Sequence, residues 1–233
     1  QKTYEIKYAL QCDLKSGNPI LYEKSTDNRS AWGNAIADLA EINKNNPTPI
    51  VVTDCDLQTS VKTAGFEKVT PDRFFQSGIM EHNTAVLSGA LSTCGIQTFW
   101  SDFGVFGLDE VYNQQRLNDI NHTNLKVVLT HTGLDVGEDG KTHQCIDYIG
   151  IVRNWYGFHL IIPADPNHTD RIIRWLIDKP GNYVITMGRS ALPIILKEDG
   201  TPFYSLNYDF DYGKCDILRK GNQGTVMVSG TPI

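Results

Sequence analysis

Residues 126–132 read Lys-Val-Val-Leu-Thr-His-Thr, a short run of β-branched and aliphatic side chains that ends in polar residues. Runs of this kind recur along the chain and alternate with longer stretches in which apolar residues follow a helical period. Because a parallel strand needs a crossover connection, this alternation predicts a parallel sheet. The predicted strands span residues 49–54, 73–77, 97–102, 126–132, 159–164 and 183–188.

The segments between those strands have the periodicity of helices. Helices are predicted over residues 30–43, 81–94, 108–121, 144–155 and 167–179. The expected fold is therefore a doubly wound α/β unit with a mainly parallel six-stranded sheet and helices on both faces. In such sheets ligands bind at the carboxyl ends of the strands, so the loops that follow the strands are expected to carry function.

The composition excludes several classes of protein. The 233 residues include 40% hydrophobic and 21% charged side chains, which is enough apolar material for one sizeable core and is unlike a disordered, collagen-like or coiled-coil chain. A net charge of −6 with scattered Lys and Arg argues against nucleic-acid binding, and the short apolar runs argue against a membrane span. The five widely spaced cysteines predict reduced thiols and a cytoplasmic location rather than zinc or disulfides.

The chain divides into three predicted parts. Residues 1–26 lack a clear period and are interpreted as a lead-in from an upstream region. Residues 27–190 form the α/β domain, and residues 191–233, punctuated by Pro and Gly, are interpreted as an interdomain crossing and the start of a C-terminal domain. Since the chain begins at Gln1 and Thr225–Gly230 look like the first strand of another domain, it is expected to be a piece of a longer protein or a subunit.

Two segments carry candidate chemistry. Residues 78–83, Gly-Ile-Met-Glu-His-Asn, put Glu81 at the start of a predicted helix, where a carboxylate either complements the helix dipole or serves a function. Residues 131–143 put two histidines and three carboxylates in thirteen residues directly after a predicted strand. A solvated turn rich in Asp and Gly is the other interpretation of this second segment.

With these segments and their neighbours in this order, the chain resembles the pyrimidine-binding domain of the transketolase family of thiamine diphosphate-dependent enzymes. The resemblance covers about residues 27–196 and is carried by seven motifs. The motifs are Arg29-Ser-Ala-Trp-Gly-Asn-Ala35, Asp56-Leu-Gln-Thr-Ser60, Pro71-Asp-Arg-Phe74, Gly78-Ile-Met-Glu-His-Asn83, Ser101-Asp-Phe-Gly-Val-Phe106, Gly137-Glu-Asp-Gly-Lys-Thr-His-Gln144 and Met187-Gly-Arg-Ser190.

The resemblance implies that Glu81 is the acid that donates a hydrogen bond to a ring nitrogen of the cofactor's aminopyrimidine. This role needs a carboxyl able to hold a proton, so burial has to outweigh the helix dipole, which favours the anion. The resemblance also implies that Phe103 and Phe106 form the aromatic pocket around the pyrimidine and that Asp56 contacts the cofactor. Ordinary core packing is the other interpretation of the two phenylalanines.

The sugar substrate is assigned by the same resemblance to polar residues of the loops. His131, Asp139 and His143 match groups that contact sugar hydroxyls, and the two histidines are also candidate catalytic groups for proton transfer. An arginine fork is well shaped to hold a phosphate. The residues that match phosphate-holding groups of the family are Arg29, Ser60 and Arg189.

The implied activity is the transfer of a two-carbon ketol unit from a ketose phosphate to an aldose phosphate, as in pentose phosphate metabolism. In this family the diphosphate and its Mg²⁺ are held by a separate domain with a Gly-Asp-Gly motif, which this sequence lacks, so no metal ligand is predicted here. The expected partners are that diphosphate-binding domain or subunit, in a homodimer or heterotetramer, and sugar phosphate substrates. The chain by itself is expected to be inactive.

Other functions remain open from the sequence. A deoxyxylulose-phosphate synthase or the beta subunit of a 2-oxo-acid dehydrogenase would keep the cofactor and change the reaction, although Glu138 and Phe106 resemble transketolase more than the synthase. A non-catalytic domain kept for assembly is the further alternative, against which the carboxyl of Glu81 argues.

Overall fold

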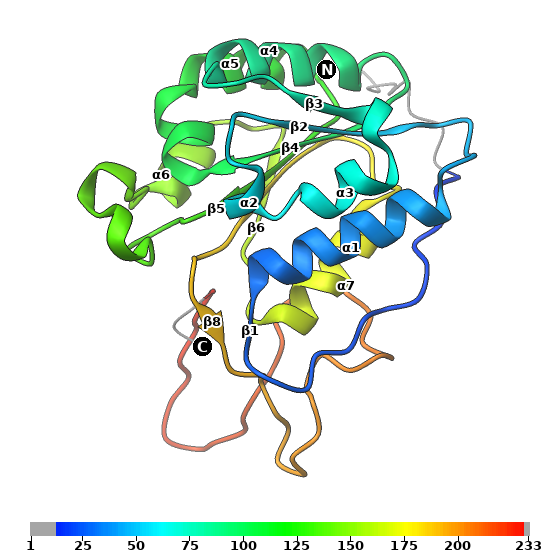
Figure 1. Cartoon of the computed structure of the whole chain (residues 1–233). Coiled ribbons are helices and arrows are strands. Elements are labelled where there is room, and N and C mark those ends of the chain that lie inside the picture. The colour runs from blue at the N-terminus through cyan, green and yellow to red at the C-terminus, as the bar shows by residue number, and fades with distance from the viewer. Residues whose placement is uncertain (1–12, 231–233) are drawn as a thin grey trace, which may run out of the picture.

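A computed structural model describes residues 13–230 of the chain. Its centre is a six-stranded sheet in the order β3-β2-β4-β5-β7-β6, and every neighbouring pair in it is parallel (Figure 1). The strands are β2 (Ile50–Asp54), β3 (Phe74–Gln76), β4 (Gln97–Phe103), β5 (Leu125–Thr130), β6 (Phe158–Ile161) and β7 (Asn182–Thr186). The doubly wound α/β fold expected from the alternating pattern is therefore confirmed.

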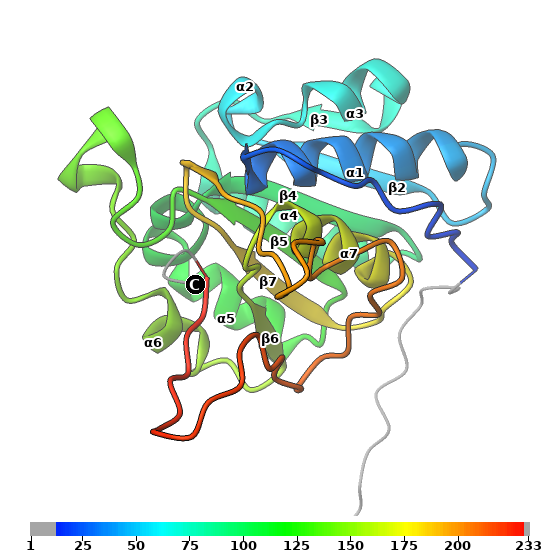
Figure 2. The same ribbon diagram turned by 90° about the horizontal axis from the view of Figure 1, so that it is seen from below.

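Helices cover both faces of this sheet. Figure 2 shows α1 and α7 on one face and α4 and α5 on the other. The α-helices are α1 (Asn28–Ile42), α2 (Gln58–Val61), α3 (Ala64–Val69), α4 (Glu81–Ser92), α5 (Tyr112–Ile120), α6 (Tyr148–Val152) and α7 (Pro166–Leu176). The remaining elements are the 3-10 turns η1 (Pro71–Arg73), η3 (Gly137–Asp139) and η4 (Lys141–His143), the π-helix η2 (Val105–Glu110), and the paired two-residue strands β1 (Thr26–Asp27) and β8 (Ala191–Leu192).

Two hydrophobic clusters form the core, one on each face. Successive residues of a strand point to opposite faces, so Phe99 packs with Trp32 of α1 while Trp100 packs with Leu108 on the other side. Because both faces are covered, the central strands are buried along their whole length, including the polar residues at their carboxyl ends.

The strand order places a switch point at the carboxyl edge of the sheet, between β2 and β4. The chain runs from β2 outward to β3 and then returns to β4 on the other side of β2. It likewise passes from β5 to the edge strand β6 before returning to β7 beside β5. Among the described strands, only the connections after the neighbouring strands β2 and β4 leave in opposite directions, and in folds of this class ligands bind in the crevice at such a switch point.

Several predicted boundaries are wrong in detail. The predicted helix over residues 144–155 is reduced to α6, and the helix over 108–121 is a π-helix followed by α5. The strand predicted to reach residue 132 ends at Thr130, which forms the last pair with β4, opposite Phe103. Residues 225–230 are not a strand in the described chain, because no neighbouring strand pairs with them. The division into parts at residues 26 and 190 stays a prediction.

Two further expectations concern membrane-spanning helices and the cysteines. Within residues 13–230, every helix is too short or too polar to cross a bilayer. The described cysteines, Cys55, Cys94, Cys145 and Cys215, are all free thiols, and Cys12 lies outside the described residues.

Candidate active site

Glu81 lies at the crevice between β2 and β4. The chain reaches it through Gly78, whose φ of +67° suits glycine, and α4 begins at Glu81 itself. Its side chain is only 6% exposed even though it stands at a helix terminus. The local geometry thus turns a first-turn carboxyl inward, toward the ends of the strands, instead of leaving it in solvent.

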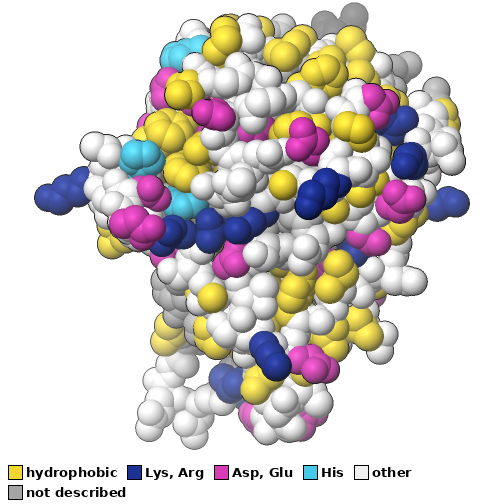
Figure 3. Space-filling view, in the orientation of Figure 1, with side chains coloured by type: hydrophobic (Ala, Val, Ile, Leu, Met, Phe, Trp, Pro, Cys, Tyr) yellow, Lys and Arg dark blue, Asp and Glu magenta, His cyan; other side chains and the backbone are white. Residues whose placement is uncertain are grey.

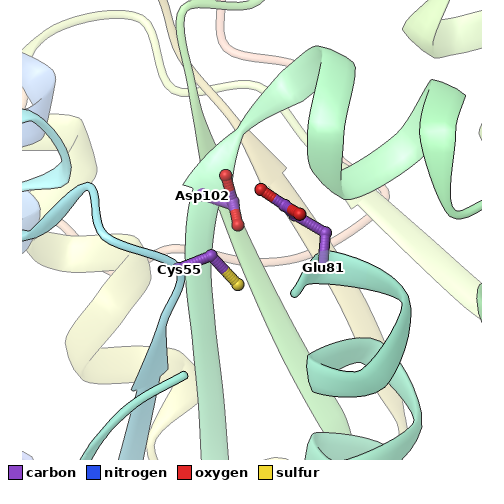
Figure 4. Close-up of side chains that lie close together, drawn as sticks. All are labelled: Cys55, Glu81 and Asp102. Atoms are coloured by element: carbon purple, nitrogen blue, oxygen red, sulfur yellow. The ribbon is translucent and has the colours of Figure 1, made fainter. Parts of the chain in front are cut away.

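Two further acidic groups meet Glu81 there. The Cys55 sulfur and carboxylate oxygens of Glu81 and Asp102 all lie within 4.8 Å of one another. Figure 4 shows the carboxyl groups of Glu81 and Asp102 pointing toward each other, with the Cys55 thiol beside them. Cys55 follows β2 directly and Asp102 belongs to the end of β4, so the sheet brings together what the sequence separates. We call Cys55, Glu81 and Asp102 the acidic cluster.

Burial controls the protonation of this cluster. The pKa of Asp102 is raised well above its usual range, chiefly by burial and further by the negative charges of Glu81 and Asp54, against the hydrogen bond from the Phe103 backbone N–H. Burial also raises the pKa of the Cys55 thiol, with Asp102 as the next cause. Both shifts favour the protonated forms of Asp102 and Cys55. A cation would have to displace those protons to bind here.

An aromatic stack begins at Phe103, the last residue of β4. The Phe103 ring, next to Asp102 in sequence, stacks on His131 with 3.8 Å between ring centroids and on Phe106 at 5.9 Å. The ring of His143 meets the edge of Phe106 at 5.4 Å. Phe103 is buried and Phe106 is half-buried, so the stack offers flat apolar surface at the carboxyl edge of the sheet. We call Phe103, Phe106, His131 and His143 the aromatic–histidine stack.

His131 is the most enclosed polar member of the stack. It adopts a φ of +55° directly after β5, and its side chain is 2% exposed. Its Nδ1 lies 2.8 Å from the Thr130 hydroxyl and its Nε2 lies 3.7 Å from Asp139 Oδ2. Burial, and next the charge of Arg29, lower the pKa of His131 from 6.5 to about 4, so the imidazole is neutral at neutral pH.

Two arginines flank the histidine. Arg29 donates from Nη1 to the Ser60 carbonyl at 3.0 Å and pairs with Asp27 at 3.3 Å, which ties the start of α1 to α2. Arg189 pairs with Glu138 at 2.7 Å across the loop of residues 131–143. Both arginines act on the pKa of His131, so their charges lie near it. Figure 3 shows histidines beside a short row of Lys and Arg side chains over this part of the surface.

Two predicted residues stand apart from the stack. Asp56 is exposed and takes a φ of +62°, while its backbone N–H donates to Gln76 at 2.6 Å. Ser60 contributes its carbonyl to Arg29, and its hydroxyl has no hydrogen bond in the described chain. The fold thus brings most of the predicted residues to one edge of the sheet, with these two on the loop and helix that follow β2.

The sequence analysis missed Asp102 and Cys55. A signal was available for Asp102, because an acid that ends the otherwise uncharged run of residues 97–103 must be buried with it. Asp135 was also missed: it accepts hydrogen bonds from the Ser190 backbone N–H at 2.8 Å and the Ser190 hydroxyl at 2.5 Å, and so holds the loop against the end of β7.

Comparisons with known proteins agree with this architecture. The sequence profile of the family described as "Transketolase, pyrimidine binding domain" matches residues 24–194. A "Putative transketolase C-terminal section" from Methanocaldococcus jannaschii is 33% identical over 208 residues, which are 88% of this chain and 62% of that protein. A subunit of the apulose-4-phosphate transketolase of Phocaeicola vulgatus is 24% identical over 206 residues, with the same coverage of 88% and 62%.

A solved transketolase structure has a similar fold. The chain superimposes on a "Split gene transketolase, inactive beta4 tetramer" with a TM-score of 0.70 and 31% identity, over 84% of this chain and 60% of that one. The chain therefore spans about three fifths of the length of these relatives.

Proposed function

Because the chain belongs to the transketolase family and is its pyrimidine-binding domain, we propose that it forms half of a thiamine diphosphate site in a ketol-transferring enzyme. The observation that carries the proposal is the buried Glu81 carboxyl at the β2–β4 crevice, next to an aromatic stack. The complete enzyme would move a two-carbon ketol unit from a ketose phosphate to an aldose phosphate.

The residues at the crevice fit the cofactor's aminopyrimidine. A planar, polar heterocycle needs flat apolar surface and an acid at its edge, and Phe103 with Phe106 and Glu81 offer both. Asp56, at the mouth of the same crevice, is the further cofactor contact in this proposal. When bound, thiamine diphosphate supplies the electron sink for breaking and forming the carbon–carbon bond.

The chain's own groups would bind and orient the sugar. His131, held neutral by burial, can accept or donate a hydrogen bond to a hydroxyl, and Asp139 stands 3.7 Å from its Nε2. His143 is the second group placed for proton transfer beside Phe106. The positive charges near His131 suit the phosphate of the substrate. That phosphate contact is assigned to Arg29, Ser60 and Arg189.

The site requires a partner for completion. Ile79 is 79% exposed and Met80 is 54% exposed, directly before the buried Glu81. Apolar side chains that are exposed to solvent beside a buried acid are typical of a surface that another polypeptide covers. We assign that surface to the diphosphate-binding domain or subunit, which would hold the diphosphate and Mg²⁺, in a homodimer or a heterotetramer located in the cytoplasm.

The test is an assay of the chain assembled with its diphosphate-binding portion. Glu81→Gln removes the acid while keeping its shape and is expected to lower kcat about 10²-fold to 10⁴-fold, as for an essential proton-transfer group. Glu41→Gln, at an exposed position of α1 paired with Lys44, is the control and is expected to keep the wild-type rate. An unchanged rate in Glu81→Gln would favour a non-catalytic assembly domain.

Substrates separate the remaining alternatives. The proposal predicts transfer between phosphorylated ketoses and aldoses. Release of carbon dioxide from pyruvate in the presence of glyceraldehyde phosphate would instead identify a deoxyxylulose-phosphate synthase, and oxidation of a 2-oxo acid would identify a dehydrogenase subunit.

A further inference from the structure

Asp102 is a buried acid with one unused oxygen. Its Oδ1 accepts the Phe103 backbone N–H at 2.8 Å, whereas its Oδ2 has no hydrogen-bond partner among the described residues. The side chain is fully buried, and it faces Glu81 (Figure 4). An unpaired charged oxygen in this position would be costly, so the free Oδ2 is the natural site for a proton.

The surroundings of the two carboxyls contain no balancing cation. Neither carboxyl forms an ion pair with any described Lys, Arg or His. At the end of β2 the neighbouring ionisable groups are Asp54 and the Cys55 thiol. A hydrogen bond with the Cys55 thiol favours the ionised form of Asp102, whereas burial and the charges of Glu81 and Asp54 oppose it. From α4 the Thr84 hydroxyl lies 3.3 Å from Cys55. Two negative charges this close in a buried site would repel strongly.

We propose that Asp102 is a positioning residue for Glu81: its Oδ2 carries a proton that it donates to the Glu81 carboxylate, so that the pair shares one proton and one negative charge. The proposal of the pair rests on the closeness of the two carboxyls and the unpartnered Oδ2, and its use in cofactor activation rests on the proposed function.

Because the proton is shared, the Glu81 carboxylate can become protonated without taking up a proton from solvent. When the proton moves, the O–H bond at Asp102 Oδ2 breaks, an O–H bond forms at Glu81, and the negative charge passes to Asp102. The Phe103 N–H then stabilises that charge at Oδ1. No proton or electron is gained or lost in this step. With the proton on its carboxyl, Glu81 can donate a hydrogen bond.

Carbon-13 NMR of the carboxyl groups of the full chain tests the pair. The Asp102 signal, assigned through carbon–carbon correlations to the Asp102 backbone, is expected to be that of a protonated acid at pH 7. Glu81→Gln is expected to move the midpoint of the Asp102 titration down by about one pH unit or more, because the partner's charge is removed. Glu41→Gln, far from the site, should leave the midpoint unchanged.

Three results would overturn the pair: an ionised Asp102 at pH 7, an Asp102 midpoint that Glu81→Gln does not move, or one equivalent of Zn²⁺ bound by the wild-type chain and lost in Asp102→Asn. The Glu81→Gln measurement keeps Asp102 in place, so it decides the matter even if Asp102→Asn folds poorly.

The assembled enzyme tests the use of the pair. Asp102→Asn is expected to move the high-pH limb of the plot of kcat against pH to lower pH by about one unit or more, because Glu81 can no longer receive a proton from Asp102. An unmoved limb would show that the pair does not serve the reaction. If the wild-type assembly transfers no ketol unit at all, the proposed function fails, while the NMR titration still decides whether the pair exists.

Discussion

Buried His131 links the stability of the domain to pH. His131 is enclosed by the Phe103 ring and the Thr130 hydroxyl, and its lowered pKa means that the folded chain resists protonating it. An unfolded chain has no such restriction. Protons therefore bind more tightly to the unfolded state over the whole range between the two pKa values.

His131 is expected to lower the free energy of unfolding at acidic pH. Its contribution is fully present above pH 6.5 and is lost as the pH falls toward about 4. Over that window the free energy of unfolding should fall by up to about 1.4 kcal/mol per pH unit more in the wild type than in His131→Asn. Chemical denaturation at several pH values measures this difference.

The control for that comparison is His122→Asn. His122 is exposed and, like His131, has a positive φ that asparagine tolerates. The dependence of the free energy of unfolding on pH should be the same for this variant as for the wild type. If it were also the same for His131→Asn, His131 would not be the cause of the pH dependence. Buried His168, whose pKa is lowered to about 3 by burial, contributes equally in every variant.

Arg189 provides a test of the proposed phosphate contact. In the assembled enzyme Arg189→Gln is expected to raise KM for a phosphorylated ketose about tenfold to a hundredfold, the effect of one charge-assisted hydrogen bond. KM for the unphosphorylated sugar should stay unchanged. Arg116→Gln, at an exposed position of α5, is the control, and equal losses for both kinds of sugar would assign Arg189 a structural role through Glu138 instead.

At the scale of elements, the π-helix after β4 determines where Phe106 lies. A π-helix carries extra residues per turn and is frequently found at functional sites. Here it spans Val105–Glu110 and packs tightly on the sheet: a Cβ at Gly107 would meet Leu129 Cδ2 at 2.3 Å. The close approach of the π-helix to β5 therefore depends on glycine at this position.

Gly107→Ala is expected to destabilise the domain by about 1–3 kcal/mol, because the added methyl group overpacks the contact with Leu129. Thermal or chemical unfolding measures the loss. Gly221→Ala is the matched control, since its Cβ would meet nothing within 4 Å. Equal stability of the two variants would show that the π-helix can move away from β5 without cost.

The sequence predicted long elements well and short or irregular ones poorly. The strands and α1, α4 and α7 follow from periodicity because each spans enough residues to repeat its pattern. α2 and α3 were missed because one or two turns are too short for a period, and the π-helix changes the period itself. The closeness of Asp102 to Glu81 depends on tertiary packing between β4 and α4, which no local pattern encodes.

At the scale of the whole molecule, the carboxyl edge of the sheet gathers acidic, aromatic and basic groups that come from distant segments. Strand order explains this gathering, because β2 and β4 are neighbours although β3 lies between them in sequence. The resemblance motifs predicted the family, which is confirmed. The roles of the individual site residues stay predictions.

Ile79 tests whether another polypeptide covers this edge. Ile79→Asp is expected to weaken association with the diphosphate-binding portion at least about tenfold, because a charge would be buried in an apolar contact. Sedimentation velocity of the mixed proteins measures the change. Leu206→Asp, at a position that is 51% exposed in residues 191–233, is the control. Unchanged assembly of Ile79→Asp would place the partner elsewhere.

The central claim is that the Glu81 carboxyl activates thiamine diphosphate. Its most direct test is proton NMR of the assembled enzyme, following the exchange of the carbon-bound proton of the cofactor's thiazolium ring for deuterium. We predict that Glu81→Gln slows this exchange about 10²-fold to 10⁴-fold while the cofactor stays bound and Glu41→Gln exchanges at the wild-type rate. Exchange at the wild-type rate in Glu81→Gln would contradict the account.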